Sequence, residues 1–442
     1  MKPPYRVPLM AEIGAVEPNG FTVVSTFSGA GGSCYGFRLA GYRVLWASEF
    51  VDAAAETYAA NYPATPLDRR DIRDVRGAEI LDAIGSSRGD VDVLEGSPPC
   101  ASFSTAGKRA AGWGAVKPYS DTKQRVDDLF FEYARLVDEI RPRVFVAENV
   151  SGLVKGVAKG YFKRILTALE APGYVVGARL LDAQWLGVPQ ARARIIFLGV
   201  RADLVERFGV RPAFPKPLPY RYSIRDALPE IAAVDGRTGP GFARTRSDID
   251  DPMNAILVSD PAQTRYEIVA VGRAHGETRS LDTPSPTIMT HGRLKTNAEL
   301  SIVETRKIAQ RDVVGENVAA SLDGYAIGAE WNRLRPGETS DRYLNLSRPD
   351  PARPSPTVTA TGGGSTGGPG GVASVTHPTE RRKFSIAELR RLCGFPDDYV
   401  LTGTYAQQWE RLGRAVPPPM MHAVASTIRD EILRRLDHDD RS

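Results

Sequence analysis

The sequence predicts an α/β protein built on a doubly wound, mostly parallel sheet, with a second, smaller, loop-rich domain. Between Phe21 and about Val200, apolar strands alternate with helical patterns, which is typical of a parallel sheet covered on both faces. After Arg201, prolines and glycines become frequent and helix-length periodicity disappears until Ser385. A chain of 442 residues also exceeds what one hydrophobic core normally supports, so two domains are expected.

Each predicted strand of the first domain is a short apolar run bounded by turn residues. In chain order these runs are Val23–Thr26, Val44–Ala47, Val91–Glu95, Val144–Ala147 and Ile195–Leu198. Helices are predicted from apolar spacing and from the residues that stop them, as Pro142 stops an amphipathic stretch. The predicted helices are one that ends at 38–40 before Gly41, then Asp52–Asn61, Leu129–Ile140, Phe162–Leu169, Ile386–Leu392 and Met421–Leu436.

The composition is that of an ordinary soluble globular protein, with 42% hydrophobic and 25% charged residues. No apolar run approaches the roughly 20 residues of a membrane span, and the N-terminus has no signal-peptide core. Three cysteines cannot form a disulfide framework, and the five histidines show no metal-ligand spacing. We therefore expect a cytoplasmic protein with no metal and no membrane partner. The net charge of +4 does not by itself indicate a nucleic-acid binder.

The turn Ser97–Cys100 places one cysteine just after the predicted strand Val91–Glu95. Its two prolines restrict the backbone and hold the thiol of Cys100 at a strand end, where ligands and reacting groups gather in open α/β sheets. A Pro-Pro-Cys turn by itself more often holds a buried, inert cysteine. The other motifs of the chain favour a nucleophile instead.

Four further motifs accompany this turn in order along the chain. A glycine-rich loop, Phe27–Gly32, follows the first strand, Glu148–Val150 ends a later one, and Gln190–Arg194 opens the next. The segment Gly413–Val416 follows near the C-terminus. This ordered set resembles the motifs of the DNA (cytosine-5) methyltransferase family, and the resemblance covers nearly the whole chain.

The resemblance implies a Rossmann-like methyltransferase sheet, S-adenosylmethionine as cofactor and double-stranded DNA as partner. We expect the protein to act as a monomer. The implied domains are an N-terminal extension at 1–20, a catalytic and cofactor-binding domain at 21–201, a target-recognition domain at 202–405, and a segment at 406–442 that returns to the catalytic domain.

The cofactor pocket is expected around the glycine-rich loop, whose glycine spacing departs from the dinucleotide fingerprint and disfavours a nicotinamide or flavin. Glu49 would accept from the ribose hydroxyls, Phe50 would stack on adenine, and Asp71 and Ile72 would contact its amino group and ring. Without the family, Glu49 and Asp71 would be ordinary loop acids. The full predicted set is Phe27, Gly29, Gly31, Gly32, Glu49, Phe50, Asp71, Ile72, Pro98, Arg414, Ala415 and Val416.

The chemistry implied by the family begins with a thiolate that adds to C6 of cytosine and makes C5 nucleophilic, a role for Cys100. Glu148 would hold the N3 edge of the base and supply a proton. Arg192 and Arg194 alternate along a strand and so share one face. Arg194 would contact the cytosine carbonyl and Arg192 would support the cysteine region; for each arginine alone, a salt-bridged strand end is the commoner role.

The target carbon is inaccessible in a stacked duplex, so the base must be flipped out. A long loop after the cysteine, rich in Gly, Ser, Lys and Arg, is predicted to close over DNA, although it could be only a solvated connection. The family usually has Gln after the cysteine, whereas this chain has Ala101. The loop residues expected to face DNA are Phe103, Lys108, Arg109, Trp113, Lys117 and Tyr119.

Three alternatives stay open. An RNA cytosine-5 methyltransferase shares these motifs but has a much shorter recognition region, and a silent DNA-binding homologue would not need the intact catalytic set. The third concerns Arg414, which stands where the family usually has Asn and would be repelled by a sulfonium. Carboxy-S-adenosylmethionine would supply a carboxylate partner, so the enzyme would transfer carboxymethyl. Otherwise Arg414 turns to a phosphate or an acidic side chain.

Overall fold

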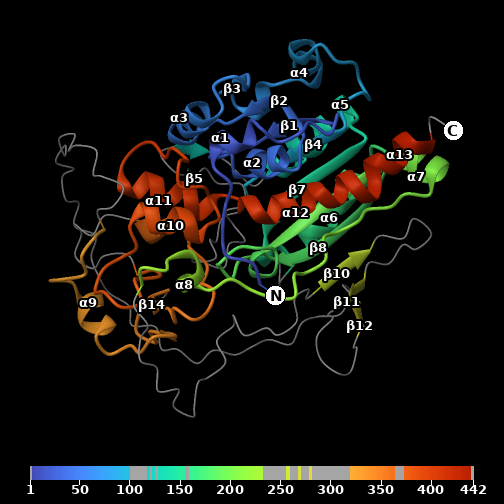
Figure 1. Ribbon diagram of the computed structural model, residues 1–442. Coiled ribbons are helices and arrows are strands. Elements are labelled where there is room, and N and C mark those ends of the chain that lie inside the picture. The colour runs from blue at the N-terminus through green and yellow to red at the C-terminus, as the bar shows by residue number, and fades with distance from the viewer. Residues whose placement is uncertain are drawn as a thin grey trace.

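Figure 1 shows a computed structural model of the chain, in which one sheet forms the centre and helices cover both of its faces. The sheet has ten strands in the order β12-β11-β10-β8-β9-β7-β4-β1-β2-β3. The structure describes residues 2–99, 117–119, 122–124, 128–154, 159–231, 255–258, 267–269, 278–280, 319–343, 345–363 and 373–439.

The predicted doubly wound, mostly parallel sheet is confirmed. Five of its strands run parallel, namely β1 (Thr22–Thr26), β2 (Arg43–Ser48), β3 (Leu67–Asp68), β4 (Val93–Gly96) and β7 (Val144–Val150). Among the seven strands from β8 to β3 in this order, the exception is β9 (Ala193–Arg201), which is antiparallel to β7 on one side and to β8 (Tyr174–Asp182) on the other. Sequence analysis predicted neither β3 nor β8.

Three short strands extend the sheet beyond β8. They are β10 (Ala255–Val258), β11 (Glu267–Val269) and β12 (Thr278–Ser280), and all of their pairings are antiparallel. They come from the part of the chain expected to form the recognition domain, yet they continue the main sheet. Separate two-stranded ribbons are formed by β5 (Lys117–Tyr119) with β6 (Thr122–Gln124), and by β13 (Glu338–Thr339) with β14 (Ser347–Arg348).

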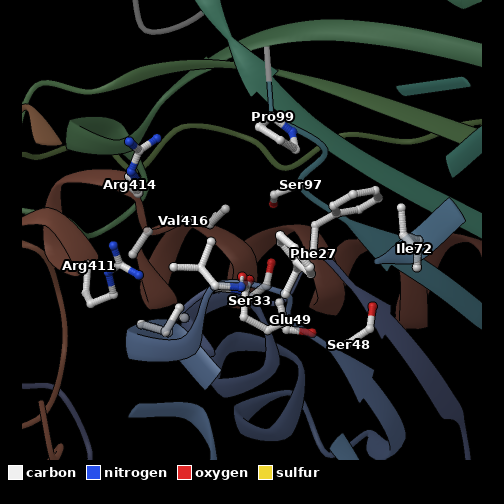
Figure 2. Close-up of a pocket in the computed structure, with 18 of the residues that line it drawn as sticks. Phe27, Ser33, Ser48, Glu49, Ile72, Ser97, Pro99, Arg411, Arg414 and Val416 are labelled. Carbon is white, nitrogen blue, oxygen red and sulfur yellow. Dashed lines mark hydrogen bonds between the residues drawn. The ribbon is translucent and has the colours of Figure 1, made fainter. Parts of the chain in front are cut away.

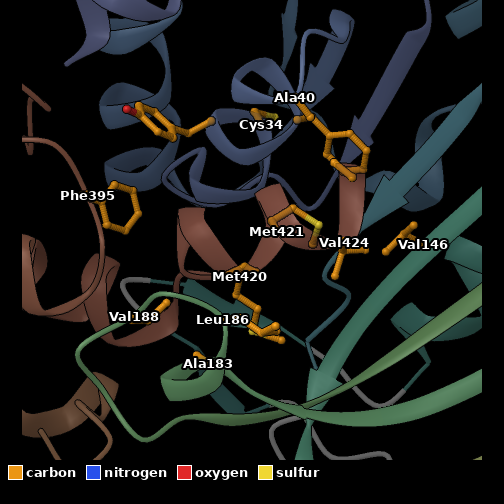
Figure 3. Packing of buried hydrophobic residues seen from close by; sticks show 14 of the residues in the cluster. Cys34, Ala40, Val146, Ala183, Leu186, Val188, Phe395, Met420, Met421 and Val424 are labelled. Atoms are coloured by element: carbon orange, nitrogen blue, oxygen red, sulfur yellow. The ribbon is translucent and has the colours of Figure 1, made fainter. Parts of the chain in front are cut away.

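Alternate residues of each central strand point into two different cores, as the period of two in a strand requires. On β1, Val23 belongs to the core under α2 (Gly32–Leu39) and α12 (Pro418–Ile428). Val24 belongs to the core under α5 (Leu129–Ile140) and α6 (Lys159–Glu170). Figure 3 shows the first of these cores, where Cys34 of α2 lies near Met421 and Val424 of α12. The return of the C-terminal helix to this face buries the apolar side of the sheet from water.

Several predicted helices have the expected bounds, including α3 (Asp52–Asn61), α5 (Leu129–Ile140) and α10 (Ile386–Leu392). The predicted C-terminal helix is divided into α12 (Pro418–Ile428), a π-helical turn (Arg429–Leu433) and α13 (Arg434–Asp439). The remaining helices are α1 (Met10–Ile13), α2 (Gly32–Leu39), α4 (Gly77–Ile84), α6 (Lys159–Glu170), α7 (Ala202–Phe208), α8 (Ile224–Ala227), α9 (Ala326–Trp331) and α11 (Tyr405–Arg414). Across the described ranges, none of the helices has the length and apolarity to cross a bilayer.

Helix α11, which sequence analysis did not predict, joins the recognition region to the catalytic sheet. It packs against the short 3-10 helix Ala360–Gly363 at contact distance, since a Cβ on Gly413 would lie 2.7 Å from the Ala360 backbone. The N-terminal segment also crosses this junction, because the Tyr5 hydroxyl donates to the Arg391 carbonyl at 2.7 Å. The last turn of α11 is thereby placed beside the carboxyl ends of the parallel strands (Figure 1).

Candidate active site

A pocket of about 920 Å³, including its open mouth, lies at the carboxyl ends of β1, β2 and β4 (Figure 2). Its walls come from the β1–α2 loop, the end of β2, the start of the 3-10 helix Ile72–Asp74, the turn after β4 and the end of α11. Most of the predicted cofactor residues line it, namely Phe27, Gly29, Gly32, Glu49, Phe50, Asp71, Ile72, Arg414, Ala415 and Val416.

Two predicted cofactor residues, Gly31 and Pro98, do not line the pocket. Gly31 has φ +85°, and a Cβ at this position would lie 2.5 Å from the ring of Tyr62, so it faces the core behind the loop. The neighbours of Pro98, Ser97 and Pro99, line the pocket in its place. Gly31 and Pro98 therefore shape the backbone of their motifs and do not line the pocket themselves. Lining residues that sequence analysis missed are Ser28, Ala30, Ser33, Ser48, Val51, Ala54, Arg70, Ser97, Pro99, Leu129 and Arg411.

The backbone of the glycine-rich loop lies between the pocket on one side and the end of α11 on the other, and it packs closely against the latter. Phe27 and Gly29 both have positive φ, +51° and +55°, which is strained for the phenylalanine but freely accessible to glycine. A Cβ on Gly32 would collide with the carbonyl oxygen of Val416. The loop and the end of α11 therefore approach so closely that only glycine fits at position 32.

Glu49 fixes the loop from the end of β2. Its carboxylate accepts hydrogen bonds from the backbone N–H groups of Gly29 and Val51, each at 2.8 Å. Burial raises the pKa of Glu49 above its usual value, and the two hydrogen bonds oppose this. Each carboxylate oxygen keeps a further lone pair for a ligand hydroxyl.

The opposite wall is formed by Asp71 and Ile72. Asp71 caps the 3-10 helix by accepting from the backbone N–H of Arg73 at 3.0 Å, and the Arg73 guanidinium pairs with its other oxygen at 2.9 Å. Ile72 is buried and offers an apolar surface to the pocket. One acidic edge and one apolar face therefore lie on this wall.

Glu148 and Arg194 form a buried ion pair at the end of β7, with the Arg194 Nε 2.8 Å from the Glu148 Oε1. Burial raises the pKa of Glu148, although Arg194 and Arg192 both lower it. The next residue, Asn149, donates to the Pro98 carbonyl at 3.1 Å and so fixes the turn that leads to Cys100. A carboxyl group whose pKa is raised by burial is therefore held next to that turn.

Arg192 is more fully buried than Arg194, at 1% exposure, and its described hydrogen bonds go elsewhere. It donates to the carbonyls of Val358 at 3.1 Å and Gly413 at 2.9 Å. It therefore ties the start of β9 both to the recognition region and to α11. Of these two arginines, only Arg194 forms an ion pair with Glu148 among the described contacts.

Several predicted site residues lie outside the described residues. They are Cys100 and Ala101, with the loop residues Phe103, Lys108, Arg109 and Trp113, whereas Lys117 and Tyr119 belong to the short strand β5. Throughout the described part of the chain, no three His, Cys, Asp or Glu side chains gather as a metal site would require.

A glycine-rich loop, an acidic strand end and a nucleoside-sized pocket on a mostly parallel sheet define a Rossmann-like methyltransferase. The family model described as C-5 cytosine-specific DNA methylase matches residues 21–430. The chain therefore belongs to the C-5 cytosine-specific DNA methylase family, whose members depend on S-adenosylmethionine.

Its relatives include Type II methyltransferases, and the alignments with them cover most of both chains. M.XorII of Xanthomonas oryzae pv. oryzae is 27% identical over 429 residues, which cover 93% of this chain and 85% of the relative. M.AgeI of Thalassovita gelatinovora is 28% identical over 448 residues, which cover 92% and 98%. A crystal structure of a putative DNA modification methyltransferase from an E. coli prophage shares the fold, with a TM-score of 0.56, 20% identity and coverage of 93% and 99%.

Proposed function

We propose that this protein is a DNA cytosine-5 methyltransferase that flips a target cytosine out of the duplex and alkylates C5 through a covalent adduct with Cys100. The buried pair of Glu148 and Arg194 supports this most strongly, because it lies at the end of β7 beside the turn that precedes Cys100. The pocket for the alkyl donor opens beside the same turn, since Ser97 and Pro99 line it (Figure 2).

The pocket fits S-adenosylmethionine, which supplies an electrophilic methyl group when it is bound. The carboxylate of Glu49 would accept from the ribose hydroxyls, while Phe50, which is 39% exposed, would cover the adenine. Asp71 and Ile72 would hold its amino edge and ring. The N–H groups at the start of α2 suit the carboxylate of the methionine end.

In the proposed reaction, the Cys100 thiolate adds to C6 of the flipped cytosine and breaks its aromaticity. Glu148 donates a proton to N3 as negative charge develops, and Arg194 holds the carbonyl oxygen, so C5 becomes the nucleophile. After alkylation, loss of the C5 proton and departure of the thiolate restore the ring. A carboxyl group with a raised pKa suits this donor role.

The DNA itself would be held between the catalytic domain (21–201) and the recognition domain (202–405), with the loop after Cys100 closing over the flipped base. The Arg192 hydrogen bonds support this arrangement, because they tie the start of β9 to the recognition region at Val358. The segment 406–442 would complete the catalytic domain by carrying α11 and α12 back to it.

Covalent trapping tests this function directly. A duplex with 5-fluorocytosine at the target position should give an adduct that survives denaturation, because fluorine at C5 blocks the elimination that releases the thiol. The same duplex with ordinary cytosine is the control and should give none. Absence of an adduct would favour a silent DNA-binding homologue, and trapping on RNA alone would favour an RNA methyltransferase.

A second candidate concerns the transferred group. Arg411 and Arg414 both line the pocket near the turn before the cysteine (Figure 2). Two guanidinium groups suit a carboxylate on the donor better than a bare sulfonium, which would make the enzyme a DNA cytosine-5 carboxymethyltransferase that uses carboxy-S-adenosylmethionine. Against this, the Arg414 Nε already pairs with Glu410 at 2.7 Å. Glu410 is thus an acidic side chain to which Arg414 turns, as expected if the enzyme uses ordinary S-adenosylmethionine.

Nucleoside mass spectrometry after incubation with each cofactor distinguishes the two. The carboxymethyl hypothesis predicts 5-carboxymethylcytosine with the carboxylated cofactor, and Arg414→Asn should shift the product strongly towards 5-methylcytosine. The exchange removes the charge that would recognise the carboxylate. If both cofactors yield only 5-methylcytosine and Arg414→Asn changes nothing, the hypothesis fails.

A further inference from the structure

A buried carboxyl group that the proposed reaction does not use lies behind the cofactor pocket. Glu95 is on β4, is 1% exposed, and pairs in register with Ser25 of β1 and Val146 of β7. Its side chain points to the same face of the sheet as those partners, towards α2. Within the described residues no lysine, arginine or histidine forms an ion pair with it, so this carboxyl group is buried without a countercharge.

A short relay of hydroxyl groups connects Glu95 to the pocket. The Ser25 hydroxyl donates a short hydrogen bond to the Glu95 Oε1, and the hydroxyls of Ser25 and Ser28 lie 2.7 Å apart. The thiol of Cys34 donates to the Ser25 Oγ at 3.2 Å. Ser28 belongs to the glycine-rich loop and lines the pocket. The relay therefore runs from a buried carboxyl group to a residue that lines the pocket, whose hydroxyl can also donate to the Ser25 carbonyl oxygen at 3.3 Å.

Each hydroxyl in this relay has one hydrogen to give, so the ends determine its direction. An ionised Glu95 only accepts, so Ser25 donates to it, Ser28 donates to Ser25, and Ser28 presents only lone pairs to the pocket. A protonated Glu95 can donate to Ser25, which then donates to Ser28 and occupies one of the two Ser28 lone pairs, while the Ser28 hydrogen turns to the Ser25 carbonyl oxygen at 3.3 Å or to the pocket. Ser28 thus offers a ligand two lone pairs when Glu95 is ionised and one lone pair when Glu95 is protonated.

We propose that Glu95 is a positioning residue for the cofactor, whose protonation sets how many lone pairs Ser28 offers to the amino-acid end of the bound nucleoside. This inference rests on the proposed function, in which that end lies at the start of α2. The ammonium group of such a ligand has only hydrogens to donate. It is therefore held better when Glu95 is ionised and Ser28 offers both lone pairs.

The relevant change of charge falls near neutral pH. Burial raises the pKa of Glu95 to about 7, opposed by the hydrogen bond from Ser25. Of the groups around it, Cys34 on α2 has a pKa raised to about 12, and burial also raises the pKa of Tyr58 on α3 and Tyr133 on α5, so all three stay neutral. Glu148 on β7 adds a repulsion that favours the protonated form of Glu95.

Calorimetric titration with S-adenosylhomocysteine between pH 6 and 8.5 tests the proposal without turnover. Affinity of the unchanged protein should rise through pH 7 relative to Glu95→Gln, because the ligand selects the ionised acid. We expect about a three- to tenfold rise, since a shift of one pKa unit on binding corresponds to a factor of ten. The ligand's own amino group titrates equally in both proteins and cancels in the ratio.

Two further variants and one further ligand sharpen the result. Ser28→Ala breaks the relay and should flatten the pH profile, whereas Glu139→Gln, a carboxyl exchange on α5 outside the pocket, should retain the original slope. 5′-Methylthioadenosine lacks the amino-acid end and should show no difference between the unchanged protein and Glu95→Gln. Thermal melting at each pH verifies that every variant is folded.

The two ways to fail are distinct. If Glu95→Gln binds S-adenosylhomocysteine with the same pH slope as the unchanged protein, the relay has no role in binding and the proposal is overturned. If neither S-adenosylhomocysteine nor 5′-methylthioadenosine binds to the folded unchanged protein, the proposed function itself is contradicted. The role proposed for Glu95 in binding the cofactor then falls as well.

Discussion

Cys100→Ser is expected to abolish transfer to DNA while leaving DNA binding largely intact. A serine hydroxyl is almost wholly protonated near neutral pH and adds to C6 far less readily than a thiolate, whereas its size hardly differs from that of the thiol. Nucleoside mass spectrometry of the DNA product measures the loss, and a gel-shift assay measures binding. Near-normal turnover in this variant would show that Cys100 is not the nucleophile.

Cys393→Ser is the matched control for this exchange. Cys393 is buried behind α10, where its sulfur accepts from the Gln190 amide at 3.3 Å, and it does not line the pocket. A serine there keeps an acceptor for the amide, so turnover per folded molecule should stay close to that of the unchanged protein. The contrast between the two cysteines separates chemistry from a general effect of losing a thiol.

Glu148→Gln is expected to lower turnover by about 100- to 10,000-fold, the range typical of general acid–base groups. The amide keeps the shape and can still accept a hydrogen bond, but it has no acidic proton to give to N3. Single-turnover kinetics with excess enzyme would measure the chemical step. Unchanged turnover combined with weaker cofactor binding would instead assign Glu148 to the cofactor pocket.

This variant also leaves Arg194 without its buried partner, and breaking a buried pair typically costs about 3 to 5 kcal/mol. Rates must therefore be expressed per folded molecule, with the folded fraction taken from thermal melting. Arg194→Met breaks the same ion pair from the other side. It should lower the stability of the fold to a similar extent, which its thermal melting measures, and it should also lower the rate, because Arg194 would hold the cytosine carbonyl oxygen in the proposed reaction.

Local sequence patterns predicted the central elements well because their signals are short-range. Short apolar runs bounded by turn residues located β1, β4 and β7, and the stop before Pro142 set the end of α5. Helix α11 was missed although it has a local start signal, the capping box of Thr404 and Gln407. Its packing partners are distant in the chain, and this packing helps to stabilise it.

For the site, the motifs identified the residues but not their connections. The pairing of Glu148 with Arg194 follows from the antiparallel register of β7 and β9, in which Val150 lies opposite Arg194. The two arginines of the same motif were expected to face one site together. In the structure, Arg192 donates to Val358 and Gly413, two carbonyls that only the folded chain brings to it.

The sequence by itself determined the fold class, the family and the residues that bear chemistry, because each of these depends on residue type and on spacing along the chain. The tertiary structure decided which of those residues touch. It reversed β9 within the sheet, laid α11 against the glycine-rich loop, and buried Glu95 behind Ser25 and Ser28. Such contacts join segments up to hundreds of residues apart, and side-chain packing selects them rather than any local preference of the backbone.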